Sequence, residues 1–178
     1  TTKLFTPGSL DRTGNKTDLA IEGSGFFKVE LADGTPRYTR DGAFHPDSTG
    51  RLVTGEGQPL DGNITIEAGM NLESVTIGSD GTVSAVRDGQ NTELGRIQLY
   101  RFPNPAGLSS QGGNLFAASE ASGAELPGTP GIDGLGTLRQ GFVESSNVEV
   151  VTELVGLITA QRAYEVNARA IRAGDEML

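Results

Sequence analysis

The sequence predicts a mainly β fold, in which an antiparallel β-rich domain is followed by one long α-helix. Up to about residue 145, short runs of alternating apolar and polar residues are separated by glycine-containing turns, as in antiparallel strands. From residue 146 the apolar residues recur instead at steps of four and three, the period of a helix that packs lengthwise. We therefore expect an extended arm at 1–17, a β-rich domain at 18–145 and a helix at 146–178.

The first strands are expected directly after the arm. Residues 1–17 are polar and contain prolines and glycines, which favours an extended lead-in. Leu19 and Ile21 then alternate with their neighbours. After a sharp bend at residues 23–25, the apolar side chains of residues 27–31 again occupy every second position. Both runs have the pattern of half-buried strands.

The dipeptide Asp-Gly marks turns along most of the domain. It occurs six times, with its aspartate at positions 33, 41, 61, 80, 88 and 133. Glycine tolerates positive φ and aspartate can accept a hydrogen bond from the backbone that follows, so this pair suits tight turns. Between these turns, apolar residues alternate as they do in strands, at Ile64 and Ile66, Val75 and Ile77, Val83 and Ala85, and Ile97 and Leu99.

Three further segments complete the expected domain. Residues 102–107 contain two prolines, which predicts a rigid turn because proline cannot donate within a sheet. Residues 119–136 are rich in glycine, proline, serine and alanine and are expected to form a long surface loop. Residues 137–143 are expected to form the last strand.

The C-terminal stretch contains nine positions spaced by four and three residues, which we call the helix seam. Seven of the nine are apolar or aromatic, and the two polar ones are Gln161 and Asp175. The seam positions are Val150, Leu154, Leu157, Gln161, Tyr164, Ala168, Ile171, Asp175 and Leu178. Gln161 is suited to setting the register between packed helices, and Asp175 is expected to be exposed.

The ends and length of this helix bear on its packing. Ser146 and Glu149 have the spacing of a capping box, which predicts where the helix begins. At ~1.5 Å per residue the helix would be roughly 50 Å long. No other segment has a sustained helical period. The seam therefore predicts contact with helices from elsewhere; the alternative is that the helix lies across its own sheet.

Composition excludes several functional classes. Lys and Arg number 14 against 23 Asp and Glu, a net charge of −9, which argues against binding to nucleic acid or to an anionic membrane surface. The absence of cysteine excludes disulfides and thiolate chemistry. No apolar run approaches the roughly 20 residues of a transmembrane helix. With 6% aromatic residues and no tryptophan, a carbohydrate- or protein-binding module is a weak alternative.

No catalytic, cofactor-binding or metal site is predicted. His45, the single histidine, lies beside Pro46 and ahead of a turn, and is expected to be an exposed turn residue. Gly23-Ser24-Gly25 lacks the further glycine and helix of a phosphate-binding loop, so a bend between strands is expected. Asp41 and Asp47 lack the spacing of a calcium loop and are expected to serve turns.

Four blocks of the sequence, in order, resemble the bacterial flagellar rod and hook family. The second block comprises residues 38–44 and 50–54, and the third comprises 102–108 and 113–116. The fourth runs from Gly141 through Ser146, Asn147 and Val148, and continues with Leu154 and residues 161–165. The first block contains Asp18, Leu19, Ala20, Ile21, Gly23, Gly25, Phe26 and Phe27. Within the family, the sequences of these blocks are most similar to those of distal rod members.

This resemblance implies a structural subunit, not an enzyme, that polymerises helically into the distal rod and transmits torque from motor to hook. It implies export by the flagellar type III apparatus to the basal body, between periplasm and outer membrane. The implied partners are copies of the protein, the proximal rod and hook proteins, the P- and L-ring proteins and a rod cap. The resemblance implies an N-terminal helix as the partner of the seam; this helix and the family's tail beyond Leu178 are not found in this sequence. A proximal rod or hook subunit is the alternative within the family.

Overall fold

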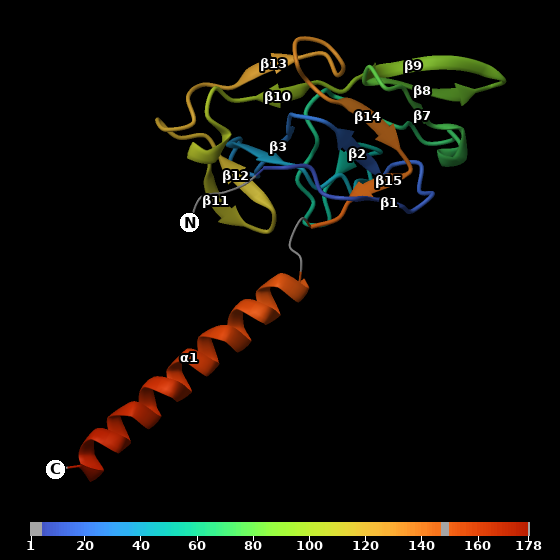
Figure 1. Ribbon diagram of the computed structural model, residues 1–178. Coiled ribbons are helices and arrows are strands. Elements are labelled where there is room, and N and C mark those ends of the chain that lie inside the picture. Colours follow the sequence, from blue (N-terminus) through green and yellow to red (C-terminus); the bar gives the residue numbers. More distant parts are fainter. Residues whose placement is uncertain (1–4, 147–149, 178) are drawn as a thin grey trace. The chain divides into compact units, whose positions relative to one another are not determined.

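The computed structural model describes residues 5–146 and 150–177, with helix side chains from residue 157 onward. The chain forms two compact units, Thr1–Ser145 and Ser146–Leu178. The first is built of short strands and the second is one helix, α1, at Val150–Glu176 (Figure 1). The predicted fold class, mainly antiparallel β with a C-terminal helix, is confirmed.

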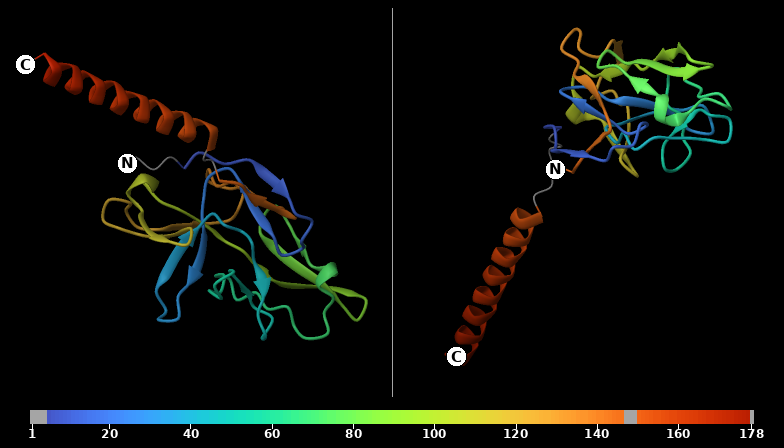
Figure 2. Two further views of the ribbon diagram at one scale, coloured as in Figure 1. Left: turned by 90° about the horizontal axis from the view of Figure 1, so that it is seen from below. Right: turned by 90° about the vertical axis from the view of Figure 1, so that its right-hand side faces the viewer.

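All strand pairings within the β unit are antiparallel, and most of its sheets are two-stranded ribbons. The largest sheet has the order β11-β12-β4-β3. Figure 1 and the left-hand view of Figure 2 show the hairpin of β8 and β9 reaching out at one end of this unit. The strands are β1 Leu10–Arg12, β2 Leu19–Glu22, β3 Phe27–Glu30, β4 Pro36–Thr39, β5 His45–Pro46, β6 Leu52–Val53, β7 Thr76–Ile77, β8 Thr82–Arg87, β9 Gln90–Arg96, β10 Leu99–Arg101, β11 Ser109–Gly112, β12 Leu115–Ala117, β13 Leu126–Gly128, β14 Thr137–Gln140 and β15 Phe142–Glu144. Two 3-10 turns, η1 Leu72–Ser74 and η2 Pro105–Gly107, complete the unit.

Two apolar clusters form the interior, and β3 lies between them. Phe27 belongs to the larger cluster, where its ring meets that of Phe44 edge-on at 5.2 Å. The preceding residue, Phe26, belongs to an aromatic cluster with Tyr38, Tyr100 and other rings. Since successive side chains of an extended chain point to opposite faces, the pair Phe26-Phe27 joins both clusters.

Strand β2 is more deeply buried than its alternating pattern predicts. Leu19, Ala20 and Ile21 are all fully buried. β2 pairs with β14 along its whole length and also contacts β15, while the Leu19 N–H donates to the Gly42 carbonyl at 2.9 Å. The small side chain of Ala20 is therefore an interior residue, as in a strand that is covered on both faces.

The structure corrects several sequence-based expectations. The predicted loop 119–136 contains strand β13, which pairs with β10. The expected last strand 137–143 is two strands, β14 and β15, separated by Gly141 at φ 80°. Ile64 and Ile66 are buried but lie in no strand; only an isolated bridge joins Thr65 to Arg51.

The arm at 1–17 also takes part in sheet formation. β1 lies within it and pairs with β15, with Leu10 opposite Glu144 and Arg12 opposite Phe142. The Ser145 N–H extends this ribbon by donating to the Ser9 carbonyl at 2.8 Å. The strand by which the chain leaves the β unit is therefore hydrogen-bonded to the arm by which it enters.

We expect the β unit to fold without the helix, because every described residue of the two apolar clusters precedes Ser146. A chain ending at Ser145 should lose the helical circular dichroism signal and keep the thermal unfolding midpoint of the β unit. Calorimetry of the two chains side by side checks this. A fall of several degrees on truncation would contradict it, because a loss of ~1 kcal/mol already lowers the midpoint by that much.

Candidate assembly surface

Several large apolar side chains of α1 are exposed to solvent. Leu157, Tyr164 and Ile171 are 62, 78 and 68% exposed, and no residue from 157 to 177 is buried. Gln161 and Asp175 are exposed as well, while Ala168 is half-buried. Six seam positions have described side chains, and all of them except Ala168 are exposed and available for contact.

Several predicted residues lie outside the part that the structure describes. Val150 and Leu154 lie in α1, but their side chains are outside the described set, and Leu178 is outside it altogether. Asn147, Val148 and Glu149 are also outside it, so the proposed capping box with Ser146 stays a prediction.

A mostly buried ion pair, with both side chains only slightly exposed, lies at the point where the chain leaves the β unit. The Arg40 Nε donates to a Glu144 carboxylate oxygen at 2.7 Å, and the two side chains are 14 and 11% exposed. The second carboxylate oxygen of Glu144 accepts from the Gly8 N–H at 2.8 Å. We call Arg40, Glu144 and Gly8 the exit clamp, because they tie β15 to both the arm and the end of β4.

The same guanidinium organises the bend in the first motif block. Its Nη1 donates to the carbonyls of Gly23 and Gly25 at 3.0 and 2.8 Å, and its Nη2 donates to the Ile21 carbonyl at 3.1 Å. Gly23 and Gly25 have φ of 125° and 127°, which confirms the predicted bend and explains the need for glycine there. The bend is a binding site for Arg40, a side chain of the same chain.

The remaining motif residues are also structural. The Asp18 carboxylate accepts from the Thr13 hydroxyl at 2.5 Å and from the Asn15 amide at 2.9 Å, which closes the turn after the arm. The burial of Leu19, Ala20, Ile21 and Phe27 places these residues in the main interior. The first block therefore builds the β unit, and within the described residues the exposed apolar surface belongs chiefly to the helix.

A network of tyrosines and carboxylates supports the aromatic cluster. The Tyr38 hydroxyl donates to Glu125, whose other oxygen lies 2.8 Å from the Lys28 ammonium. The Tyr100 hydroxyl donates to Asp61, and the Lys28 ammonium lies 4.9 Å from the centre of the Tyr100 ring. Burial first, and then the carboxylate that accepts each hydroxyl, raises the pKa of both tyrosines well above the ordinary value of 10.

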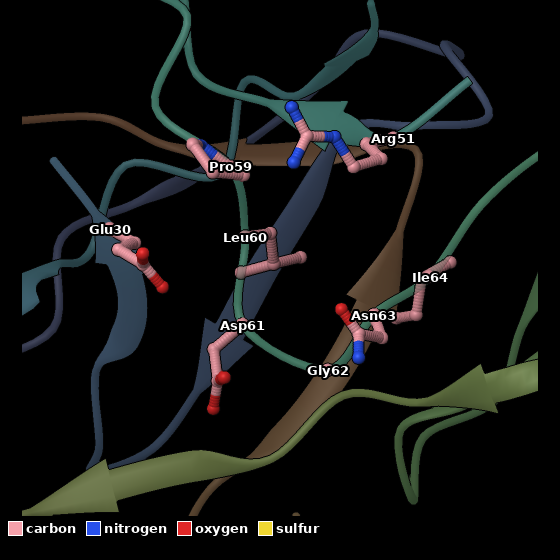
Figure 3. Close-up of a pocket in the computed structure, with 8 residues that line it drawn as sticks. All are labelled: Glu30, Arg51, Pro59, Leu60, Asp61, Gly62, Asn63 and Ile64. Atoms are coloured by element: carbon pink, nitrogen blue, oxygen red, sulfur yellow. The ribbon is translucent and has the colours of Figure 1, made fainter. Parts of the chain in front are cut away.

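One pocket of the β unit is lined by three charged side chains, Glu30, Arg51 and Asp61. This pocket has a volume of about 110 Å³, and the rest of its lining comes from the segment 59–64 (Figure 3). Asp61 in that segment is already the acceptor for Tyr100. Among the described residues, no three His, Cys, Asp or Glu side chains are grouped so that they could hold a metal ion.

His45, Asp41 and Asp47 take part in strand pairing or in the hydrogen bonds of turns. His45 is exposed, as predicted, but it pairs with Val53 in a short ribbon and is not part of a turn. Asp41 accepts from the Ala43 N–H at 3.1 Å. Asp47 accepts from the N–H groups of Thr49 and Arg51 at 2.8 and 3.1 Å, so the predicted turn roles are confirmed.

Sequence reasoning missed the exit clamp. Arg40 and Glu144 each fall within a block that resembles the flagellar family, which was the available signal. No pattern pairs them, because they are 104 residues apart.

Replacing Arg40 by methionine should destabilise the β unit by about 2–4 kcal/mol, because it leaves the mostly buried Glu144 carboxylate without its charged partner and removes three hydrogen bonds to backbone carbonyls. Chemical denaturation of purified protein measures the loss. Arg87→Met is the matched control: the Arg87–Glu67 pair is 54% exposed on both sides, so its loss should cost at most about 1 kcal/mol. Equal losses in the two variants would show that the clamp is not a buried charge pair.

The raised tyrosine pKa values predict an alkaline loss of stability. The native state keeps Tyr38 and Tyr100 protonated above pH 10, where an unfolded tyrosine releases its proton, so the free energy of unfolding should fall as the pH rises beyond 10. Below pH 10 this contribution is fully present. Urea unfolding at successive pH values tests it, and in the double variant Tyr38→Phe, Tyr100→Phe the decline should become shallower. An unchanged slope would contradict the prediction.

No helix among the described residues is both long and apolar enough to cross a membrane.

Comparisons with known protein families and relatives agree with this architecture. Residues 20–85 match the family model described as the flagellar hook protein FlgE/F/G D1 domain. Residues 139–178 match that of the flagellar basal body rod FlgEFG protein C-terminal region. The second match includes α1 and the strand that leads to it.

Individual relatives match along nearly the whole chain. The flagellar basal-body rod protein FlgG of Borreliella burgdorferi is 48% identical over 180 aligned positions, covering 100% of this chain and 68% of the relative. FlgG of Bacillus subtilis is 42% identical, covering 98% of this chain and 67% of the relative. The rod protein FlgF of Caulobacter vibrioides is 41% identical, covering 93% of this chain and 64% of the relative. The chain therefore belongs to the FlgG family of flagellar basal-body rod proteins, a family of structural subunits and not of enzymes.

Proposed function

We propose that this protein polymerises helically into the distal rod of the bacterial flagellum, the shaft that transmits torque from motor to hook. The observation that carries the proposal is the exposed apolar face of α1, on which Leu157, Tyr164 and Ile171 are each more than 60% exposed. An exposed apolar stripe of this length on a helix is stable in water only when it is covered by other helices.

The distribution of charge around α1 favours several neighbours over a single partner. Between Leu157 and Ala173 the charged residues are Arg162, Glu165, Arg169 and Arg172. At about 100° per residue these four project within an arc of roughly 80°, which leaves about three quarters of the circumference without charge. One partner helix covers a stripe only slightly wider than about 100°. In the interior of a polymer, a helix contacts neighbours on more than one side. Such neighbours together can cover an uncharged surface that is too wide for one partner helix.

Most of the seam forms the proposed contact surface of this polymer. This surface consists of the seam positions from Val150 to Ile171, together with Leu178, and leaves out Asp175. A contact between two different patches, repeated from copy to copy, gives an open helical polymer when it does not close into a ring. Gln161, the polar position in the middle of the seam, would set the register between neighbouring helices.

The exit clamp suits the transmission of torque. A load on the helix passes along the backbone into β15, which is paired with β1 and held by Arg40 through Glu144. Because Arg40 also binds the carbonyls at the bend after β2, the load reaches the main apolar cluster without a free hinge inside the β unit.

The finer partner assignments follow from family membership and from the resemblance of the sequence blocks. We propose contacts with copies of the protein, with proximal rod and hook proteins, with the P- and L-ring proteins and with a rod cap. Export by the flagellar type III apparatus would bring the subunit to the basal body, between periplasm and outer membrane.

A proximal rod position is the second candidate, and the 41% identity to FlgF of Caulobacter vibrioides supports it. Complementation separates the two positions. Restored motility in a mutant lacking the distal rod protein, but not in one lacking a proximal rod protein, supports the distal position, and the reverse pattern would replace it.

Leu157→Glu in the complete protein should abolish rod assembly and motility, because it places a charge in the middle of the seam. Arg169→Glu is the matched control: it introduces the same residue about 120° around the helix, on the charged arc. Swimming assays and electron microscopy of isolated basal bodies measure the outcome, and circular dichroism confirms that both variants remain folded. Normal rods in the Leu157 variant would exclude the seam as the contact surface.

A further inference from the structure

Six Asp-Gly pairs occur in this chain, and the same dipeptide that favours turns is also open to a spontaneous reaction. The backbone nitrogen of the glycine can attack the aspartate side-chain carbon when both groups are free and the backbone can rearrange. Glycine permits the approach because it has no side chain in the way. The folded structure decides which of the six pairs meet these conditions.

The pairs 33–34 and 80–81 have both reacting groups engaged. Their carboxylates accept from the N–H groups of Thr35 and Thr82 at 2.8 and 3.1 Å. Each glycine nitrogen donates to the carbonyl three residues earlier, at 2.9 and 3.0 Å. Attack would require breaking both hydrogen bonds, so these pairs are protected.

The pairs 41–42 and 61–62 are restricted in a different way. Their carboxylates accept from the Ala43 N–H at 3.1 Å and from the Tyr100 hydroxyl. Their glycines lie against backbone: a Cβ built on Gly42 or Gly62 would meet a carbonyl oxygen at 1.7 or 2.9 Å. The backbone has little room to rearrange at either pair.

The pairs 88–89 and 133–134 lack all of these restraints. All four residues are exposed, and a Cβ built on either glycine would meet nothing within 4 Å. Among the hydrogen bonds and ion pairs of the described residues, none engages the carboxylate of Asp88 or Asp133 or the nitrogen of the following glycine. Both aspartates also have left-handed backbone, at φ 49° and 53°, which is unfavourable for a residue with a side chain.

We propose that Asp88 and Asp133 are sites of spontaneous isomerisation to isoaspartate in the folded protein. The glycine nitrogen forms a bond to Cγ of the protonated carboxyl, and one carboxyl oxygen leaves as water together with the amide proton. This gives a five-membered succinimide. Water then breaks one of the two ring C–N bonds: cleavage at Cγ restores aspartate, and cleavage at the backbone carbonyl carbon gives isoaspartate. The reaction needs no oxidant, reductant or enzyme.

The product would alter the turn that joins β8 to β9. Asp88 and Gly89 are the two residues between these strands, and both have positive φ, as the tightest hairpin turns require. Isoaspartate adds one backbone atom at this turn, at the end of the hairpin that Figure 1 shows reaching out from the β unit. The register between Arg87 and Gln90 would change first.

The test is to incubate the complete folded chain at neutral pH and to follow all six sites by peptide mass spectrometry. Electron-transfer fragmentation distinguishes isoaspartate from aspartate at each position. We expect isoaspartate at 88 and 133 to accumulate at least about fivefold faster than at 33 and 80, the order of the factor for one net hydrogen bond. The double variant Asp88→Glu, Asp133→Glu should form almost none, since glutamate would need a six-membered ring.

The same chain in denaturant is the control for the intrinsic reactivity of the dipeptide. There all six pairs should react at comparable rates, because the hydrogen bonds of pairs 33–34 and 80–81 and the close packing of pairs 41–42 and 61–62 are lost. Equal rates at the six sites in the folded chain would overturn the proposal. So would an absence of isoaspartate at 88 and 133 in the folded chain while the denatured chain forms it.

Discussion

The hydrogen bonds of one mostly buried guanidinium, that of Arg40, connect β2 with β15, the last strand of the β unit. Arg40 donates to three backbone carbonyls at the first bend and to the carboxylate of Glu144 on the last strand. A buried charge is tolerated only when its donors are matched, so the bend, β4 and β15 must hold these positions together. The Gly8 N–H completes the site by donating to the same carboxylate. The first and last parts of the unit are thereby joined through one side chain.

Large apolar side chains are mostly buried in the β unit and mostly exposed in the described part of the helix. The β unit places its large apolar side chains in two clusters and satisfies its buried tyrosines with carboxylates. The described part of the helix has no buried residue and displays leucine, tyrosine and isoleucine to solvent. A β unit with its own apolar clusters, joined to a helix with exposed apolar side chains, is the arrangement expected of a polymer subunit, and it agrees with membership of a rod protein family.

Local patterns predicted the elements whose cause is local. The helix, the bend at 23–25 and the turns at Asp41 and Asp47 follow from periodicity, glycine and side-chain hydrogen bonds within a few residues. The strand β13 was missed because its sequence, Leu126–Gly128, contains proline and glycine and is stabilised by pairing with β10. The strand expected at Ile64 and Ile66 did not form, although both residues are buried; alternation there reflects burial and not a ladder partner.

The order of the amino acids was enough to predict the fold class, the long helical period without a partner segment and, through the motif blocks, the family. Each of these depends on the order of residues along a short stretch. The contact of Arg40 with Glu144, the pairing of the arm with β15, and the lack of close contacts at two of the six Asp-Gly pairs are visible only in the folded chain. These features arise between residues that are far apart in sequence, and no local pattern records which side chain or carbonyl will be close enough to engage them.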